Sequence, residues 1–360
     1  MCYTLACKSV FTFNIFLIGE FMKEIVIDAY GGDYSPTEII KGAVLALKKI
    51  KDKSFKIILT GKSDEIKLFL SDYKYDAERI EVIEASEIIS NNESPTDAIK
   101  NKKNSSLVVA LDYLKQNENA VALISAGSTG AVLTGGFLKI GRIKGVSRPA
   151  LAPLLPTKKE SKTLLIDCGA NMDCKPINLV HFAMMGSIYM QCLYGIEKPR
   201  VALLNVGVED KKGNELCKEV FPLLKQLNIN FVGNMEARDA FSGDYDVIVT
   251  DGFGGNVLLK TAEGCINLVT GEIKSLTKKS LSGLVGVSFM SSVFKKLKKK
   301  IDYTKMGGSP FLGIKKLIIK SHGSSKAKTI LSCVQQALVL QEKNINQKIE
   351  QELEQLSIVE

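Results

Sequence analysis

Six loops of this chain combine glycine with small polar side chains, and each follows a short apolar run. Glycine lets backbone N–H groups approach a ligand closely, and the first turn of a following helix offers unpaired N–H donors and a positive dipole. Such loops suit an anion, and phosphate is the natural ligand. Turn and cap chemistry explains any one of them, but six together favour a binding site. The loops are 28–33, 125–130, 167–171, 205–207, 250–256 and 321–325.

The side chains and glycines of these loops supply the candidate binding groups. The loops that follow parallel strands all lie at the carboxyl edge of the sheet, so we expect these six loops to line one polar crevice. The candidates for binding phosphate or substrate are Asp28, Gly31, Gly32, Asp33, Gly127, Ser128, Thr129, Gly130, Asp251, Gly252, Gly254, Gly255, His322 and Gly323.

Two lysines and two asparagines are the candidate catalytic groups. Lys260 lies four residues after Asn256, so the two share one face of a predicted helix near its N-terminus, where an anion would sit. Lys175 follows Asn171 and could act in the same way from the next loop. For each lysine alone, a solvated surface position is an equal alternative.

Several motifs of other enzyme classes are missing. The chain has no P-loop, no G-x-G-x-x-G after its first strand and no G-x-S-x-G elbow, which argues against nucleotide hydrolysis, dinucleotide binding and serine hydrolysis. Asp28, Asp33 and Asp251 could together bind magnesium, but as turn and cap residues they need no metal. We therefore expect neither a metal nor a cofactor.

Cysteine and histidine offer little catalytic material. The eight cysteines are scattered without C-x-x-C spacing, which is typical of reduced thiols in a cytosolic protein. His181 lies in an apolar helical stretch and is more consistent with a core residue, and His322 is the other histidine. Cys168 and Cys174 flank the Gly-Ala-Asn turn and are weak candidates for a thiol nucleophile.

The elements that must position these loops follow an alternating pattern. Apolar runs without polar alternation indicate strands buried on both faces, and helical patterns such as 37–50 separate them. The sequence therefore predicts an α/β fold with a doubly wound, mostly parallel sheet covered by helices on both faces. The expected strands are 24–27, 56–59, 80–83, 120–124, 163–166, 201–204, 230–232, 246–249 and 316–319.

Composition narrows the function further. The 360 residues are 45% hydrophobic and 24% charged, as in an ordinary globular protein. The net charge of +9 comes almost wholly from lysine rather than arginine, so we expect diffuse attraction to anions and no nucleic-acid reading.

Seven motifs in order resemble the phosphate acyltransferase family, the acyl-ACP:phosphate acyltransferases of bacterial phospholipid synthesis. The resemblance runs from about residue 22 to about residue 340. Two positions depart from it, because the family usually has Met in place of Tyr30 and Asn in place of Ser128. The motifs are DAYGGD at 28–33, SAGSTGA at 125–131, RPALA at 148–152, DCGAN at 167–171, LLNVG at 203–207, TDGFGGNV at 250–257 and KSHGSS at 320–325.

The resemblance implies transfer of a long-chain fatty acyl group from acyl carrier protein to inorganic phosphate. Phosphate is itself a nucleophile, so the enzyme needs no covalent intermediate and must position phosphate and stabilise the oxyanion. The resemblance also implies a cytoplasmic homodimer, peripheral association with the membrane, and delivery of acyl phosphate to a membrane glycerol-3-phosphate acyltransferase.

Three segments depart from the strand–helix alternation. Residues 1–21 read as an extension outside the fold, and residues 341–360 as an acidic, frayed terminal helix after a single domain spanning 22–340. Residues 276–306 predict a helical insertion in which an apolar stretch precedes a lysine cluster, suited to an anionic membrane or to acidic acyl carrier protein. A dimer-interface hairpin or a solvated basic face is an equal alternative. The cluster comprises Lys295, Lys296, Lys298, Lys299 and Lys300.

Two other functions remain open at this level. Phosphotransacetylases and decarboxylating dehydrogenases share a similar architecture, but the dehydrogenases need an arginine cluster and metal-binding carboxylates that this chain lacks. A short-chain phosphotransacetylase would use an acyl-coenzyme A thioester. A non-catalytic membrane scaffold would depend on the lysine cluster and tolerate changes at Asn256 and Lys260.

Overall fold

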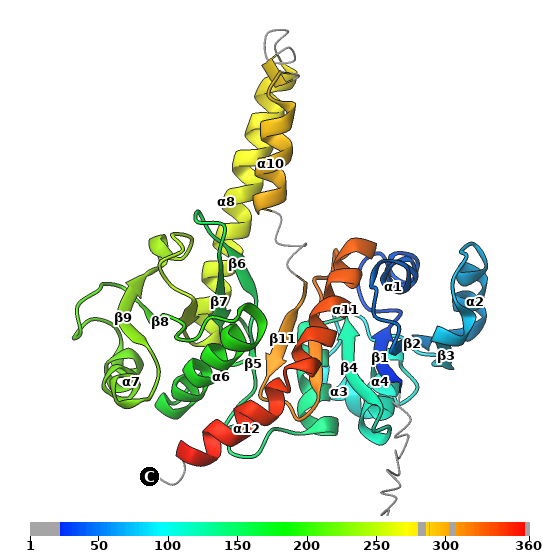
Figure 1. Cartoon of the computed structure of the whole chain (residues 1–360), viewed down its shortest axis with the longest axis horizontal. Helices are drawn as coiled ribbons and strands as arrows, with labels where there is room; N and C mark the ends of the chain where they lie inside the picture. Colours follow the sequence, from blue (N-terminus) through cyan, green and yellow to red (C-terminus); the bar gives the residue numbers. More distant parts are fainter. Residues whose placement is uncertain (1–21, 280–285, 288, 302–306, 357–360) are drawn as a thin grey trace, which may run out of the picture.

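The α/β class expected from the sequence is confirmed, with mostly parallel strands flanked by helices. The computed structural model describes residues 22–279, 286–287, 289–301 and 307–356, and the expected extension 1–21 lies outside them. The strands form two sheets, one of 7 strands in the order β3-β2-β1-β4-β12-β11-β5 and one of 5 in the order β6-β7-β10-β8-β9. Figure 1 shows the two sheets as two halves of the molecule.

The first sheet is covered on one face by α1 and α11 and on the other by α4, because alternate residues of its strands pack in two separate clusters with these helices. The middle of its central strands is mostly buried Ile, Val and Leu, as the apolar runs predicted, and buried polar side chains such as Asp28, Ser125 and Lys320 lie at the strand ends. The strands are β1 (Lys23–Asp28), β2 (Phe55–Gly61), β3 (Ile80–Glu84), β4 (Ala120–Ser125), β5 (Ala150–Leu151), β11 (Ser309–Leu312) and β12 (Leu317–Lys320). The helices are α1 (Thr37–Lys49), α2 (Ser63–Ser71), α3 (Pro95–Asn101), α4 (Ser106–Gln116), α5 (Thr129–Gly135) and α11 (Ala327–Glu342).

In the second sheet, α6 and α7 pack on the strands, and α8 begins against β7. Gly186 allows the close approach of α6, because a Cβ there would lie 2.6 Å from Val247 Cγ1. The strands are β6 (Leu154–Pro156), β7 (Lys162–Ile166), β8 (Val201–Asn205), β9 (Phe231–Glu236) and β10 (Val247–Val249). The helices are α6 (Pro176–Tyr194), α7 (Glu215–Gln226), α8 (Gly252–Lys278), α10 (Ser291–Ile301) and α12 (Ile345–Leu356).

Nine expected strands coincide with observed ones, and three observed strands were not expected. The latter are β5, β6 and β11, and they make the antiparallel pairs β11–β12, β11–β5 and β6–β7. With 2 to 4 residues each, they are too short for a periodic pattern. Their position matters, because β5 ends the first sheet and β6 begins the second.

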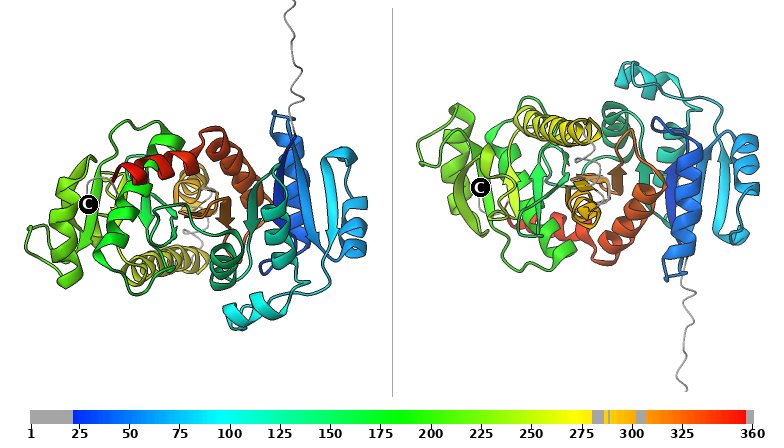
Figure 2. Two further views of the ribbon diagram at one scale, coloured as in Figure 1. Left: turned by 90° about the horizontal axis from the view of Figure 1, so that it is seen from below. Right: turned by 90° about the horizontal axis from the view of Figure 1, so that it is seen from above.

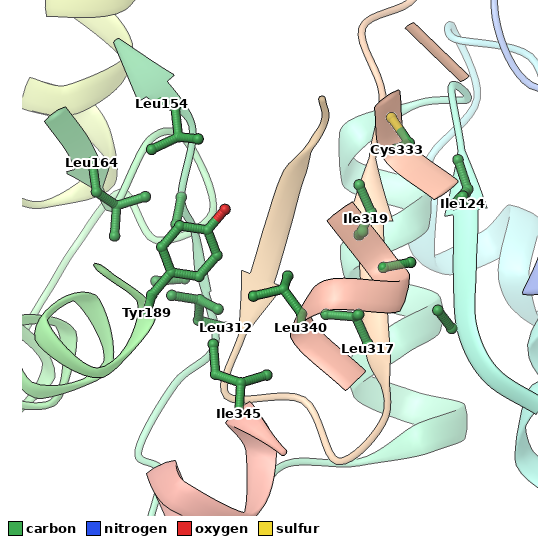
Figure 3. Packing of buried hydrophobic residues seen from close by; sticks show 14 of the residues in the cluster. Ile124, Leu154, Leu164, Tyr189, Leu312, Leu317, Ile319, Cys333, Leu340 and Ile345 are labelled. Carbon is green, nitrogen blue, oxygen red and sulfur yellow. The ribbon is translucent and has the colours of Figure 1, made fainter. Parts of the chain in front are cut away.

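One hydrophobic cluster crosses from sheet to sheet (Figure 3). Tyr189 of α6 is fully buried there, and its hydroxyl accepts a hydrogen bond at 2.8 Å from Gln336 Nε2 of α11. Leu312 and Leu317, on either side of the turn from β11 to β12, belong to the same cluster. This shared core holds the two halves against each other.

Helix α12 belongs to that core, which differs from the frayed end expected for this acidic segment. Ile345, Ile349 and Leu353 are buried and α12 packs against α6. Their spacing of four places them on one helix face, so a narrow apolar stripe outweighs a mostly polar composition.

The expected helical insertion contains the end of α8 and all of α10. Both helices extend beyond the two sheets in Figure 1, and Figure 2 views them along that direction. Of the 27 residues of α8, only Gly252 and Gly255 are buried. Among the described residues, no helix has the length and apolar character needed to cross a membrane.

Candidate active site

A cleft between the two sheets gathers several of the expected residues. It encloses a cavity of about 300 Å³ at the carboxyl ends of the strands. Thr129 and His322 line it from the first half, and Asn256 and Lys260 line it from α8. Apolar side chains form much of the remaining wall, including Leu151, Leu154, Leu155, Leu259 and Ile266.

The second-half wall is organised by Asp167, a fully buried carboxylate at the end of β7. Its Oδ1 accepts hydrogen bonds from the N–H groups of Leu151 (2.8 Å), Cys168 and Ala170 (3.3 Å). Its Oδ2 accepts from the backbone N–H of Asn171 at 2.7 Å and from Asn171 Nδ2 at 2.9 Å. Burial raises the pKa of Asp167 to about 6, and these donors oppose that rise, so the carboxylate is ionised at neutral pH.

Asn171 therefore serves this loop rather than the cavity. Its side-chain amide is shared between Asp167 and the backbone oxygen of Pro149, at 2.8 Å from the latter. Asn171 is buried and does not line the cleft cavity.

The start of α8 is docked on the same loop. Gly252 N–H donates to Asn171 O at 2.7 Å, and a Cβ on Gly255 would lie 1.9 Å from Asp167 O. Asp251 caps the helix, with its Oδ1 accepting from Gly254 N at 2.6 Å. Three N–H groups expected to bind an anion, those of Gly252, Gly254 and Gly255, thus already have acceptors within the protein.

This docking aims the next helical turn at the cleft. A Cβ on Gly169 would lie 3.6 Å from Asn256 Cγ, so the amide of Asn256 lies directly over the Asp167 loop. Lys260 follows one turn later, and both line the cavity.

The first-half wall is a set of close-packed turns around Asp28. Its Oδ2 accepts a 2.7 Å hydrogen bond from Ser125 Oγ, which in turn accepts from Gly127 N at 3.1 Å. A Cβ on Gly31 would lie 2.6 Å from Gly127 N, so glycine is required at 31. Burial raises the pKa of Asp28, whose hydrogen-bond donors partly offset the effect.

The turn 31–33 also packs against the loop after β12. Asp33 N–H donates to Gly323 O at 2.8 Å. Gly32 has φ +98°, in the left-handed region that favours glycine, and a Cβ there would lie 2.9 Å from Gly323 O. Six of the expected residues therefore pack behind the cavity surface and do not line the cavity itself. They are Asp28, Gly31, Gly32, Asp33, Gly127 and Gly323.

The start of α5 at this cleft has no side-chain cap, in contrast to the start of α8. Its first turn contains N–H groups without intrahelical acceptors, and Thr129 lines the cavity. Ser128 precedes the helix and makes no side-chain cap. Gly130 packs on the neighbouring helix, since a Cβ there would lie 2.7 Å from Pro95 Cγ.

Charge in the cleft comes from more groups than the sequence predicted. Lys260 Nζ lies 2.8 Å from Glu263 Oε2, and both line the cavity. Lys320, at the end of β12, also lines it and was not among the expected residues. Burial lowers the pKa of His322, so its imidazole is neutral at pH 7. Its Nδ1 accepts from Ser324 N at 3.2 Å, which assigns the ring proton to Nε2.

Other expected groups lie outside this cleft cavity. Lys175 is exposed at the start of α6. Asn205 and Val206 of the loop 205–207 line a second cavity of about 690 Å³, together with Asp251 and Gly254. This cavity uses a different face of α8 and is mostly apolar. Lys295, Lys296 and Lys300 lie on α10, and the side chains of Lys298 and Lys299 lie outside the described residues.

The thiols near the cleft are unsuited to nucleophilic attack. Burial raises the pKa of Cys168 and of Cys174 to about 12, so both are neutral thiols at physiological pH. Within the described ranges, no group of three or more His, Cys, Asp and Glu side chains is placed to hold a metal ion.

The docking of α8 yields a matched pair of variants. Gly255→Ala places a methyl group against Asp167 O, so we expect it to lower the free energy of unfolding by about 1–3 kcal/mol. Gly264→Ala, on the same helix with nothing within 4 Å of the added Cβ, is expected to be neutral or stabilising by up to about 1 kcal/mol. Urea unfolding of both variants measures this, and equal stabilities would contradict the docking.

Comparison with known proteins identifies the family. The model of the fatty acid synthesis protein family matches residues 23–348. A phosphate acyltransferase of Clostridium acetobutylicum is 46% identical over 92% of this chain and 99% of its own length. One of Thermoanaerobacterium thermosaccharolyticum is 44% identical over 92% of this chain and 96% of its own.

Solved structures show the same fold at low identity. A phosphotransacetylase from Streptococcus pyogenes aligns with a TM-score of 0.57 and 15% identity, covering 89% of this chain and 96% of its own. A branched-chain phosphotransacylase from Enterococcus faecalis has a TM-score of 0.55 and 15% identity, covering 88% and 98%. The chain therefore belongs to the fatty acid synthesis protein family of phosphate acyltransferases, and it is an acyltransferase.

Proposed function

We propose that this enzyme transfers a long-chain fatty acyl group from acyl carrier protein to inorganic phosphate in the cleft. The observation that carries the proposal is the pairing, within one cavity, of cationic and amide groups with an apolar wall. Lys260 and Asn256 suit an oxyanion or phosphate, and the leucines and isoleucine of the wall suit an acyl chain. The mostly apolar second cavity gathers fewer charged groups.

The chemistry needs no protein nucleophile. An oxygen of phosphate forms a bond to the thioester carbonyl carbon, and a tetrahedral oxyanion develops on the carbonyl oxygen. The carbon–sulfur bond then breaks, its electron pair leaves on sulfur, and the thiolate takes a proton from water. The neutral state of Cys168 and Cys174 fits this direct route.

An acyl phosphate assay tests the proposal. With purified protein, long-chain acyl-ACP and phosphate, hydroxylamine trapping is expected to detect a phosphate-dependent product. Asn256→Ala with Lys260→Ala should reduce kcat/KM at least about 100-fold, because each removes a charge-stabilising group from the cleft.

A matched double variant controls for surface changes on the same helix. Glu272→Ala with Lys274→Ala alters two α8 residues beyond the cleft cavity and should retain the rate. Turnover of acetyl-coenzyme A but not acyl-ACP would instead support a short-chain phosphotransacetylase, and no turnover of either would support a scaffold.

We extend the proposal to peripheral membrane association through the segment containing α10. Phe289 is 85% exposed, and Met290, Val293 and Leu297 are exposed nearby. Exposed lysines of α10 lie between and after these apolar residues, and each Lys near an anionic surface contributes about 1 kcal/mol. Such a site could receive acyl chains from the cytoplasm and pass acyl phosphate to a membrane glycerol-3-phosphate acyltransferase.

Vesicle sedimentation tests the membrane contact. The protein is expected to sediment with phosphatidylglycerol-containing vesicles and less with pure phosphatidylcholine. Phe289→Glu should reduce binding at least about tenfold, because it places a charge at an exposed apolar position. Leu68→Glu changes an equally apolar, 70% exposed residue of α2 and should bind normally. Unchanged vesicle binding by Phe289→Glu, with a raised KM for acyl-ACP in a Lys295→Ala, Lys296→Ala variant, would assign the cluster to the carrier protein instead.

We also propose that α8 meets a second copy of this chain. Its exposed apolar residues include Phe253, Val257, Leu268, Val269 and Leu276, which a solvated helix would not retain. Sedimentation velocity is expected to give a dimer, and Leu268→Glu should shift it toward monomer, because a charge then enters the interface. A monomeric wild-type protein would contradict this interface.

A further inference from the structure

Lys320 is a buried cation without a carboxylate partner. It ends β12 and is 8% exposed. Its Nζ donates to two backbone oxygens, at 3.5 Å to Ala126 O and closely to Ser321 O. Among the described residues, no carboxylate oxygen lies within ion-pair distance of this nitrogen. Burying an ammonium without a direct ion pair is costly, so an anionic ligand in contact with it would stabilise it.

The other lysine of the cleft is different in kind. Lys260 has a side chain 55% exposed and is paired with Glu263, so much of its charge is already compensated. Lys320 has three N–H donors and two protein acceptors, which leaves one donor for a ligand. Both lysines line the same cavity, with Thr129 and His322.

We propose that the ammonium group of Lys320 binds the inorganic phosphate that attacks the acyl thioester in the cleft. This inference rests on the proposed function and assigns its phosphate site. Lys320 forms no covalent bond and keeps its proton throughout. It neutralises part of the phosphate charge and holds the attacking oxygen near the carbonyl carbon. Asn256 and Lys260 on α8 stabilise the oxyanion.

The position of Lys320 suits this role. It lies at the carboxyl end of a strand, beside Ser125 of β4 in the sheet register. The loop that follows β4 leads to Thr129, so Lys320 and Thr129, which both line the cavity, come from adjacent strands. A phosphate bound there would receive the positive charge of the ammonium.

The ionisation of Lys320 provides a readout. Burial lowers its pKa to about 8, so the group is charged at pH 7 and loses its charge as the pH rises through 8. Phosphate is already mostly the dianion there, so its own titration does not weaken binding at higher pH. Among the titratable groups that act on the ammonium, Cys333 on α11 and the carboxyls of Asp28 and Asp33 favour its charged form, and Lys260 on α8 opposes it.

Phosphate binding to the purified enzyme tests the proposal without acyl transfer. Equilibrium dialysis with radiolabelled inorganic phosphate at about pH 7 is expected to show binding 10- to 100-fold weaker for Lys320→Met, the range for a lost charge-assisted hydrogen bond. Lys320→Arg is expected to bind within a few-fold of wild type. Wild-type affinity should fall above about pH 8, and the fall should be absent in Lys320→Arg, because guanidinium stays charged.

Lys316 supplies the matched control. It precedes the same strand and also donates to two backbone oxygens, at 2.7 Å to Asn117 O and 3.0 Å to Ala120 O. It faces a different cavity, at the other end of the strand. Lys316→Met should therefore keep wild-type phosphate affinity, whereas a purely structural role of bonding carbonyls would make the two variants behave alike.

The outcomes separate this inference from the proposed function. Wild-type phosphate affinity in folded Lys320→Met, or a fall above pH 8 that persists in Lys320→Arg, would overturn it. A raised KM for acyl-ACP with unchanged phosphate affinity would place the carrier's phosphodiester there instead, and would also overturn it. If Lys320→Met does not fold, the pH series of wild type and Lys320→Arg decides. Lys320-dependent phosphate binding without acyl phosphate formation would reject only the proposed function.

Discussion

The cleft depends on one buried carboxylate. Asp167 takes five N–H donors, one from Leu151 at the edge of the first sheet and four from its own loop at the end of β7. The same loop receives the start of α8 through Gly252 and Gly255. Four backbone N–H groups and one side-chain amide therefore surround a single buried charge at the junction of the halves. Loss of any one donor would leave part of that charge uncompensated in the interior.

The two halves supply different kinds of group to the cavity. The first half contributes Thr129 of α5 and the buried ammonium of Lys320, whereas α8 contributes an amide and an ion pair. An acyltransferase that brings phosphate to an acyl carbonyl needs donors or positive charge in two places, around the anionic phosphate and at the carbonyl oxygen where negative charge develops. Placing the two sources on separate sheets lets each be held rigidly by its own strand ends.

The sequence predicted most of the strands and loops, but it could not show which backbone N–H groups already bond to acceptors within the protein. The Ile, Val and Leu runs identified nine strands because burial on both faces leaves an apolar signature. Gly252, Gly254 and Gly255 have the composition of an anion loop, yet the N–H of Gly252 is taken by Asn171 O, far away in the chain, and those of Gly254 and Gly255 are taken by Asp251. Lys320 was not identified as a site residue, because a lysine directly after an apolar run is typical of the exposed end of a strand. Lys320 is buried because β11 pairs with β12 and α11 packs on it, and neither contact can be predicted from the local sequence.

The order of strands in the first sheet has a consequence for synthesis on the ribosome. Strand β12 pairs with β4, and β11 and β5 complete the sheet beyond it. The N-terminal strands emerge early, but the partner for the edge of β4 is among the last elements to be translated. At about 5–20 residues per second, that edge stays open for on the order of ten seconds or more, during which its unpaired N–H and C=O groups can template contacts with other chains. Nascent-chain protection by a chaperone is therefore most valuable between the translation of β4 and that of β12.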